Sequence, residues 1–297
     1  MTHVATLVSD PARPALDGAT LERAAGALPR AGATRWLSPG VAADIPFEPA
    51  SGQDARMLAE AVRAVLAAPA DVAVQPLAGR RKRLLIADMD STLIGQECID
   101  ELADELGLKE HVAAITERAM RGEIEFEPAL RERVGLLAGL PAGVVDKVLA
   151  ERITLTPGGR ALVMTMRRDG GYAALVSGGF TVFTGPIARQ LGFDEHRSNV
   201  LEAEDGVLAG SVREPILGRE AKLSALVELR DRLGLSAAET LAVGDGANDL
   251  DMLGEAGLGV AFHAKPAVAA AAHARIDHSD LSALLFLQGY SADEFAA

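Results

Sequence analysis

Two aspartates that follow a short apolar segment are the residues of this chain best suited to chemistry. Residues 84–87 read Leu-Leu-Ile-Ala and predict a buried strand, because the run is too short for a helix. Asp88 and Asp90 come next, and side chains at positions i and i+2 of an extended chain share a face. Ligands bind beyond the carboxyl ends of strands in open α/β sheets. We therefore expect both carboxylates in one crevice.

Two carboxylates this close disfavour each other's ionisation. A cation between them, or a proton held by one of them, relieves the electrostatic repulsion. Either arrangement suits phosphoryl transfer, with one aspartate as a nucleophile beside Mg²⁺ and the other as acid and base. The segment Asp-Met-Asp-Ser-Thr at 88–92 also fits a turn that caps a helix, and short motifs alone give false positives.

Two later apolar segments end in similar polar clusters. A predicted strand at 172–176 leads to Ser177-Gly178-Gly179, where a hydroxyl and bare N–H groups could bind an anion, although a tight turn is the alternative. A predicted strand at 241–244 leads to residues 245–249, Asp-Gly-Ala-Asn-Asp. Carboxylate and amide oxygens suit Mg²⁺, and a structural loop rarely needs so many together.

Four helices are predicted between the first two strands, at 96–106, 111–121, 128–137 and 142–152. Roughly 55 residues of helix exceed an ordinary crossover connection. We therefore expect a helical cap at 97–153, inserted into a catalytic core formed by residues 80–96 and 154–297. Further core helices are predicted at 161–168, 181–191, 219–233, 268–273 and 281–287, strands at 258–262 and 275–277, and a hairpin from 198–202 and 207–212. The pattern favours an α/β fold with a Rossmann-like parallel sheet.

Residues 1–79 are expected to form a small α+β module, with strands at 3–8, 35–37, 45–47 and 71–74 and helices at 16–28 and 55–67. No group of residues there suggests chemistry. Amino-acid sensing, a homodimer contact and simple packing on the core stay open, and packing is favoured. The basic run Arg80-Arg81-Lys82-Arg83 is interpreted as a solvated linker.

Composition limits the partners. A net charge of −13 over 297 residues argues against nucleic acid and anionic membranes as partners, since both are polyanions. Cys98 is the only cysteine, which excludes an internal disulfide and a cysteine-only metal site. No signal peptide is apparent, and no segment has the ~20 apolar residues of a membrane span. We expect a soluble, cytoplasmic protein.

In this order, Asp-Met-Asp-Ser-Thr, Ser-Gly-Gly-Phe, an upstream lysine and Gly-Asp-Gly-Ala-Asn-Asp resemble the haloacid dehalogenase superfamily of phosphotransferases. Glu-Cys-Ile-Asp at 97–100, Gly-Glu-Ile-Glu-Phe at 122–126 and Leu-Arg-Glu-Arg-Val at 130–134 resemble the phosphoserine phosphatases of that superfamily. The resemblance spans residues 84–290. The combination is specific, whereas no single motif is.

The resemblance implies Mg²⁺-dependent hydrolysis of O-phospho-L-serine through an aspartyl-phosphate, the last step of serine biosynthesis. Asp88 would be the nucleophile and Asp90 the acid and base. Mg²⁺ would be held by Asp88, the backbone carbonyl of Asp90, and Asp245. In the cap, Glu97 would bind the substrate ammonium, Arg133 its carboxylate, and Phe126 would exclude water. The remaining implied residues are Ser177, Gly178, Lys222 and Asn248 for the phosphoryl group, with Asp249 and Thr92 in support.

Other classes of protein fit less well. A cation-pumping ATPase of the same superfamily would lack the second aspartate and would need membrane helices. A glycosyltransferase that uses Asp-x-Asp would leave residues 245–249 unexplained, and a non-catalytic amino-acid-binding regulator would have lost Asp88. The nearest rival is a phosphatase or phosphotransferase for another small amino-acid phosphate, such as that of threonine or homoserine.

Overall fold

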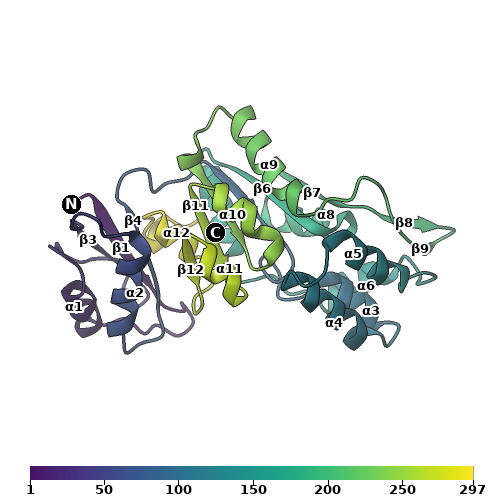
Figure 1. Ribbon diagram of the computed structural model, residues 1–297, viewed down its shortest axis with the longest axis horizontal. Coiled ribbons are helices and arrows are strands. Elements are labelled where there is room, and N and C mark those ends of the chain that lie inside the picture. Colours follow the sequence, from purple (N-terminus) through teal and green to yellow (C-terminus); the bar gives the residue numbers. More distant parts are fainter. Residues whose placement is uncertain (297) are drawn as a thin grey trace.

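Six parallel strands form the central sheet of the computed structural model, which describes residues 1–296 (Figure 1). The strands are β5 (Leu84–Ala87), β6 (Tyr172–Phe180), β7 (Glu195–Asn199), β10 (Thr240–Gly244), β11 (Leu258–Phe262) and β12 (Ala274–Ile276). Their order is β12-β11-β10-β5-β6-β7. The chain therefore builds outward from β5 on one side and from β10 on the other, and the crevice between these two strands is the expected ligand site.

Helices cover both faces of this sheet, which explains why β5 is apolar throughout. Leu85 and Ala87 belong to the cluster that includes residues of α7 (Gly159–Arg168), α8 (Thr181–Leu191) and α12 (Ala283–Leu287). Leu84 and Ile86 point the other way and belong to a second cluster, with residues of α9 (Arg219–Arg232), α10 (Leu250–Glu255) and α11 (Pro266–Ala271). The predicted α/β fold is confirmed.

Four helices are inserted between β5 and β6: α3 (Cys98–Asp104), α4 (Lys109–Met120), α5 (Phe126–Gly135) and α6 (Val144–Glu151). The two chain segments that lead into and out of this cap pair with each other. The Gly95 N–H donates to the Thr154 carbonyl at 3.1 Å, and the Thr156 N–H donates to the Leu93 carbonyl at 2.9 Å. The cap is therefore attached to the core through one two-stranded neck.

The hairpin of β8 (Leu201–Glu204) and β9 (Val207–Val212) lies against the cap, although it belongs to the core in sequence (Figure 1). The Gly139 N–H donates to the Leu208 carbonyl at 2.8 Å, and the Ala142 N–H donates to the Gly206 carbonyl at 2.9 Å. The cap is thus extended by a segment that follows it by about fifty residues in the chain.

Several predicted element boundaries are wrong. β6 continues through Ser177-Gly178-Gly179 to Phe180, with an irregular register against β7 between Val176 and Phe180, so this cluster lies within the strand and not after it. The predicted strand 198–202 is divided between β7 and β8. The helix predicted from 96 begins at Cys98, because Glu97 has extended backbone angles, and the helix predicted from 281 begins at Ala283.

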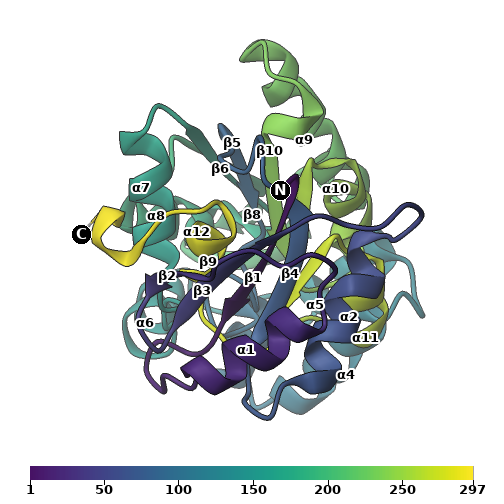
Figure 2. The same ribbon diagram turned by 90° about the vertical axis from the view of Figure 1, so that its left-hand side faces the viewer.

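The N-terminal module is a four-stranded antiparallel sheet with two helices. Its elements are β1 (His3–Val8), α1 (Gly18–Gly26), β2 (Arg35–Ser38), β3 (Ala42–Phe47), α2 (Ala55–Val65) and β4 (Asp71–Pro76), and the strand order is β2-β3-β1-β4. Figure 2 views the molecule from the side of this module. One sheet face packs on α1 and α2, whereas Val8, Ala42 and Ala73 belong to the cluster of the catalytic core.

The basic run at 80–83 is only half solvated, so its interpretation as a linker is wrong. Arg81 and Arg83 are exposed, but Arg80 and Lys82 are buried, as expected for alternating side chains of an extended segment. Arg80 donates to Asp44 Oδ2 at 2.7 Å and to the Leu287 carbonyl at 3.1 Å. It therefore joins the N-terminal sheet to the end of α12.

Asp71 forms a second buried connection between module and core. Its carboxylate accepts hydrogen bonds from the backbone N–H groups of Asp277 at 2.7 Å and Ser279 at 2.9 Å. Residues 1–79 thus pack on the core, an arrangement compatible with each of the three roles considered for the module. No helix within residues 1–296 is long and apolar enough to cross a membrane.

Candidate active site

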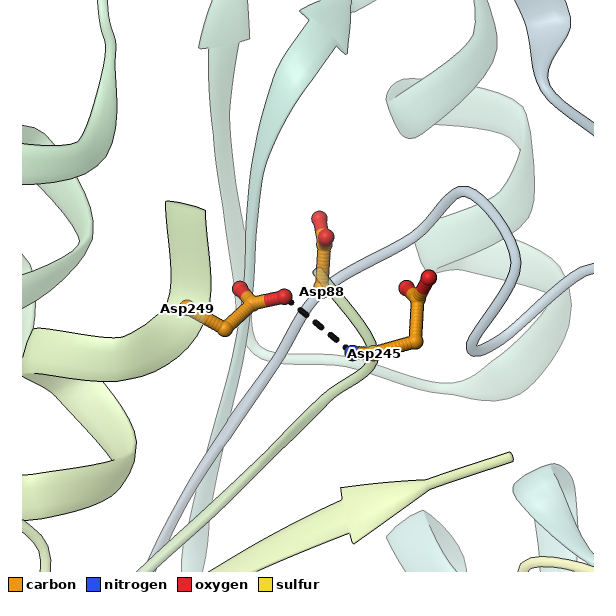
Figure 3. Close-up of side chains that lie close together, drawn as sticks. All are labelled: Asp88, Asp245 and Asp249. Atoms are coloured by element: carbon orange, nitrogen blue, oxygen red, sulfur yellow. Dashed lines mark hydrogen bonds between the residues drawn. The ribbon is translucent and has the colours of Figure 1, made fainter. Parts of the chain in front are cut away.

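Three carboxylates meet at the crevice between β5 and β10. Asp88 follows β5, and Asp245 and Asp249 follow β10; one oxygen from each lies within 4.8 Å of the others (Figure 3). The strands themselves position them, because the Asp88 N–H continues the parallel pairing by donating to the Val243 carbonyl at 3.0 Å. All three side chains are buried. The sequence clusters at 88–92 and 245–249 are thus brought together.

Lys222, on α9, lies between two of these carboxylates. Its Nζ is 2.7 Å from Asp88 Oδ2 and 2.6 Å from Asp249 Oδ1, and the residue is 1% exposed. Burial alone lowers the pKa of Lys222, but Asp249 and Asp88 outweigh it and raise that pKa above its usual value. The lysine is therefore a fixed positive charge beside Asp88.

Asp249 organises the loop after β10. Its second oxygen accepts hydrogen bonds from the backbone N–H groups of Gly246 at 3.1 Å and Asp245 at 3.2 Å. A Cβ at Gly244 would lie 2.3 Å from Asp249 Cγ, so only glycine fits at that position. Both oxygens of Asp249 thus hold neighbouring groups in place, one the lysine and the other the loop backbone.

The donor set fits a hard divalent cation. Burial, reinforced by Asp249 and Asp88, raises the pKa of Asp245 well above its usual value, while Thr92 Oγ1 donates to Asp245 Oδ1 at 3.1 Å. The Oδ1 atom of Asn248 is buried and has no hydrogen-bond partner among residues 1–296. Clustered carboxylates with one lysine leave an excess of buried negative charge, and oxygen donors of this kind suit Mg²⁺.

Asp90 lies between the cap and β6. Its Oδ1 accepts a hydrogen bond from the Cys98 N–H at 3.0 Å, and its Oδ2 would be 2.9 Å from a Cβ at Gly179. The chain turns sharply after it, with Ser91 in the left-handed region at φ 54°. Burial and the neighbouring Asp88 raise the pKa of Asp90 to about 6. A carboxyl group with this pKa can hold and release a proton near neutral pH.

A pocket of about 240 Å³ lies between core and cap at this site. The predicted residues that line it are Asp88, Asp90, Glu97, Phe126, Arg133, Ser177, Gly178 and Asn248. Lys222, Asp245, Asp249 and Thr92 are not among its lining residues; they are buried and linked to Asp88 or to one another. Sequence reasoning missed Thr116 and Arg219, which also line the pocket, because a single threonine or arginine on a predicted helix carries no distinguishing signal.

The cap places one acidic and one basic side chain in this pocket. Glu97 Oε1 accepts a hydrogen bond from the Ser91 hydroxyl at 2.6 Å, and burial, with Asp90 and Asp245 nearby, raises the pKa of Glu97. Arg133, 5% exposed, donates from Nε to the Ala129 carbonyl at 3.0 Å. Neither Glu97 nor Arg133 forms an ion pair within the described residues. A ligand that carries both an ammonium and a carboxylate would satisfy both.

Phe126 closes the pocket against the core. A Cβ at Gly178 would lie 2.7 Å from Cζ of the Phe126 ring, and a Cβ at Gly218 would lie 3.2 Å from its Cδ1. The ring therefore rests directly on core backbone at two glycines. Glycine is required at 178 for this close approach, in addition to any role of its N–H toward a ligand.

Known proteins match this chain in sequence and fold. Residues 85–254 match the model of the haloacid dehalogenase-like hydrolases. The chain belongs to this family. A phosphoserine phosphatase of Polaromonas sp. is 50% identical over 210 residues, which are 69% of this chain and 89% of that protein. The phosphoserine phosphatase SerB2 of Mycobacterium tuberculosis is 49% identical over 229 residues, 76% of this chain but only 56% of that protein. This chain thus spans about half the length of that relative.

A solved structure of this hydrolase family agrees with the fold. It is described as a phospho-aspartyl intermediate analogue of phosphoserine phosphatase, is 41% identical, and aligns with a TM-score of 0.66. The alignment covers 69% of this chain and 98% of that one.

Proposed function

We propose that this chain is a Mg²⁺-dependent phosphoserine phosphatase that hydrolyses O-phospho-L-serine to L-serine and phosphate, the last step of serine biosynthesis. The observation that carries the proposal is the pair of unmatched charges, Glu97 and Arg133, in the same pocket as Asp88. The names of the relatives support it. A phosphomonoesterase without amino-acid specificity would have no use for that pair.

In the proposed reaction, a carboxylate oxygen of Asp88 bonds to phosphorus and the bond from phosphorus to the serine oxygen breaks. Asp90 gives its proton to that leaving oxygen. Asp90 then takes a proton from a water molecule, whose oxygen attacks phosphorus and releases phosphate from Asp88. Asp88 is oriented for attack, because Lys222 holds its Oδ2 and the Met89 N–H donates to its Oδ1 at 2.8 Å.

The transferring group carries negative charge, and the site supplies the opposite charge. Lys222, the Ser177 hydroxyl, the Gly178 N–H and the Asn248 side chain would bind the phosphoryl oxygens. Mg²⁺, held by Asp88, Asp245 and the Asp90 carbonyl, would neutralise charge on the same oxygens. Asp249 and Thr92 keep Lys222 and Asp245 in place.

Substrate selection belongs to the cap. Glu97 would bind the ammonium of phosphoserine, and Arg133 its carboxylate through the planar fork of its guanidinium. The pocket volume of about 240 Å³ lies below the ~300–1,000 Å³ of sites for drug-sized ligands, which favours a small metabolite. Phe126 would exclude water while the aspartyl-phosphate exists. We assign catalysis to the core (80–96 and 154–297) and substrate selection to the cap (97–153). The expected compartment of the reaction is the cytoplasm.

Phosphate release from the purified chain tests this function. L-phosphoserine is compared with phosphothreonine, a sugar phosphate and p-nitrophenyl phosphate, each with Mg²⁺ and with excess EDTA. We expect phosphoserine to be preferred by orders of magnitude over the sugar phosphate and p-nitrophenyl phosphate, because these two leave the buried Glu97 and Arg133 without partners. Phosphothreonine also carries an ammonium and a carboxylate, so its rate tests only the space for the added methyl group. Similar rates on all substrates would show that Glu97 and Arg133 do not select the substrate. Full activity in EDTA would remove the assignment of the metal.

A further inference from the structure

A chain of buried hydrogen bonds leads away from Arg133 into the cap. Arg133 Nη1 donates to Thr116 Oγ1 at 2.9 Å, and the Thr116 hydroxyl in turn donates to Asp100 Oδ1 at 2.8 Å. The three side chains come from α5, α4 and α3 and are 5%, 4% and 9% exposed. One residue from each of three cap helices thus meets at the pocket wall, where Thr116 and Arg133 both line the cavity.

The arrangement is unusual for a buried arginine close to a buried aspartate. Such a pair normally forms a direct, often bidentate, ion pair, which would occupy the guanidinium. Here the threonine hydroxyl lies between the two charges, and Arg133 forms no ion pair within residues 1–296. The carboxylate of Asp100 therefore acts on Arg133 from a distance without covering the N–H groups that a ligand would use.

The guanidinium is nevertheless fixed in orientation. The Ala129 carbonyl accepts from Nε at 3.0 Å, and Thr116 accepts from Nη1. Two acceptors on different nitrogens define the plane of the group, and most of its N–H donors remain for a ligand. An arginine held in this way loses little side-chain entropy when a carboxylate binds.

We propose that Thr116 and Asp100 are positioning residues that present Arg133 to the substrate carboxylate. This inference rests on the proposed function. Thr116 orients the guanidinium and keeps Asp100 apart from it, while Asp100 compensates the buried positive charge before substrate arrives. Selection for a carboxylate-bearing substrate is thus set by a triad across three helices, and not by Arg133 alone.

The test compares kcat and KM on L-phosphoserine and on p-nitrophenyl phosphate for the Mg²⁺-loaded protein. Thr116→Val keeps the shape of the side chain and removes the hydroxyl. We expect its KM for phosphoserine to rise roughly tenfold, the scale of one hydrogen bond to a charged group, and its preference for phosphoserine over p-nitrophenyl phosphate to fall by a similar factor. Thr116→Ser restores the hydroxyl and should restore the preference.

Thr184→Val is the matched control. Thr184 is also fully buried, and its hydroxyl bonds to His196 Nδ1 at 2.9 Å and to Ser198 Oγ at 2.7 Å, but it does not line the pocket. Its substrate preference should equal that of the wild type. Thermal melting of all variants measures any loss of folding, and Asp100→Asn provides a second disruption of the triad if Thr116→Val is too unstable.

Equal losses on both substrates in Thr116→Val, or no change in the preference, would overturn this inference while leaving the phosphatase function in place. A wild-type chain that does not prefer phosphoserine would overturn the proposed function first, and the role of the triad with it. The two failures are thus distinguished by the wild-type measurement alone.

Discussion

In the proposed mechanism, the immediate neighbours of Asp88 orient its carboxylate for attack. Its two oxygens have different partners, since Lys222 Nζ lies 2.7 Å from Oδ2 and the Met89 N–H donates to Oδ1. A preorganised charge of this kind needs no rearrangement at the moment of reaction, which is the main source of electrostatic catalysis.

Asp88→Asn should lower phosphate release by at least ~10³-fold, because an amide cannot form the aspartyl-phosphate. The fold should persist, since asparagine can still accept from the Met89 N–H and one charge leaves a crowded anionic cluster. Steady-state assays and circular dichroism melts check both statements. Asp231→Asn, at an exposed carboxylate, is the control and should behave as wild type. Near-normal turnover by Asp88→Asn would refute the mechanism.

At the scale of elements, an aromatic ring of the cap packs directly on the core at the pocket. Phe126 begins α5 and contacts two glycines of the core, Gly178 in β6 and Gly218 before α9. A side chain at either glycine would hold the cap away from the core. Glycine at positions 178 and 218 is thus needed for the cap to close over the pocket.

Gly178→Ala should lower kcat/KM for phosphoserine at least roughly tenfold, because its methyl would overlap the Phe126 ring and force the cap outward. Phe126→Ala alone should also lower it, through admission of water. A double-mutant cycle measures the coupling between the two residues. The kcat/KM of the double variant should be higher than the product of the two single losses predicts. Strictly multiplicative losses would show that the contact does not govern closure.

The sequence predicted most elements, and its failures have local physical causes. The helix at 181–191 and the strand at 258–262 match α8 and β11, since the first has a glycine directly after it and the second is uniformly apolar. β7, Glu-His-Arg-Ser-Asn, was missed because it has no apolar residue and obtains its strand character only from pairing with β6.

In the candidate site, too, some residues could be predicted from local sequence and others could not. Asp88, Asp90, Asp245 and Asn248 were found because their short motifs follow strands directly. Thr116 was not found, because its role depends on how three helices pack, and that information is spread over residues 100–133. Sequence reasoning thus identified the polar residues that follow the strands better than those that orient other side chains of the pocket.

At the scale of the whole molecule, the N-terminal module is fixed to the core through polar contacts of long sequence separation. Arg80 joins Asp44 in the module to the carbonyl of Leu287 near the other end of the chain. A run of basic residues does not reveal which of them will be buried, so the linker interpretation failed. A buried ion pair of this kind favours one docked arrangement over others.

Arg80→Met should lower the free energy of unfolding by about 3–5 kcal/mol, because it leaves Asp44 buried without its partner. Arg83→Ala, at a 60% exposed side chain, should change it by less than about 0.5 kcal/mol. Urea unfolding followed by Trp36 fluorescence reports on the module, and far-ultraviolet circular dichroism reports on the whole chain. Equal stabilities of the two variants would show that Arg80 is dispensable for docking.

The paired neck of the cap also bears on how such proteins diversify. The chain leaves the core near Leu93 and returns near Thr156, and the two segments hydrogen-bond to each other. At the sheet, the inserted cap is therefore connected like a short hairpin, and the number of residues in the cap does not change this connection. Recombination at this neck could replace one substrate-recognising insert with another of different length while the catalytic strands keep their register. A new substrate specificity could thus be acquired by exchange of the cap, while the catalytic residues of the core stay the same.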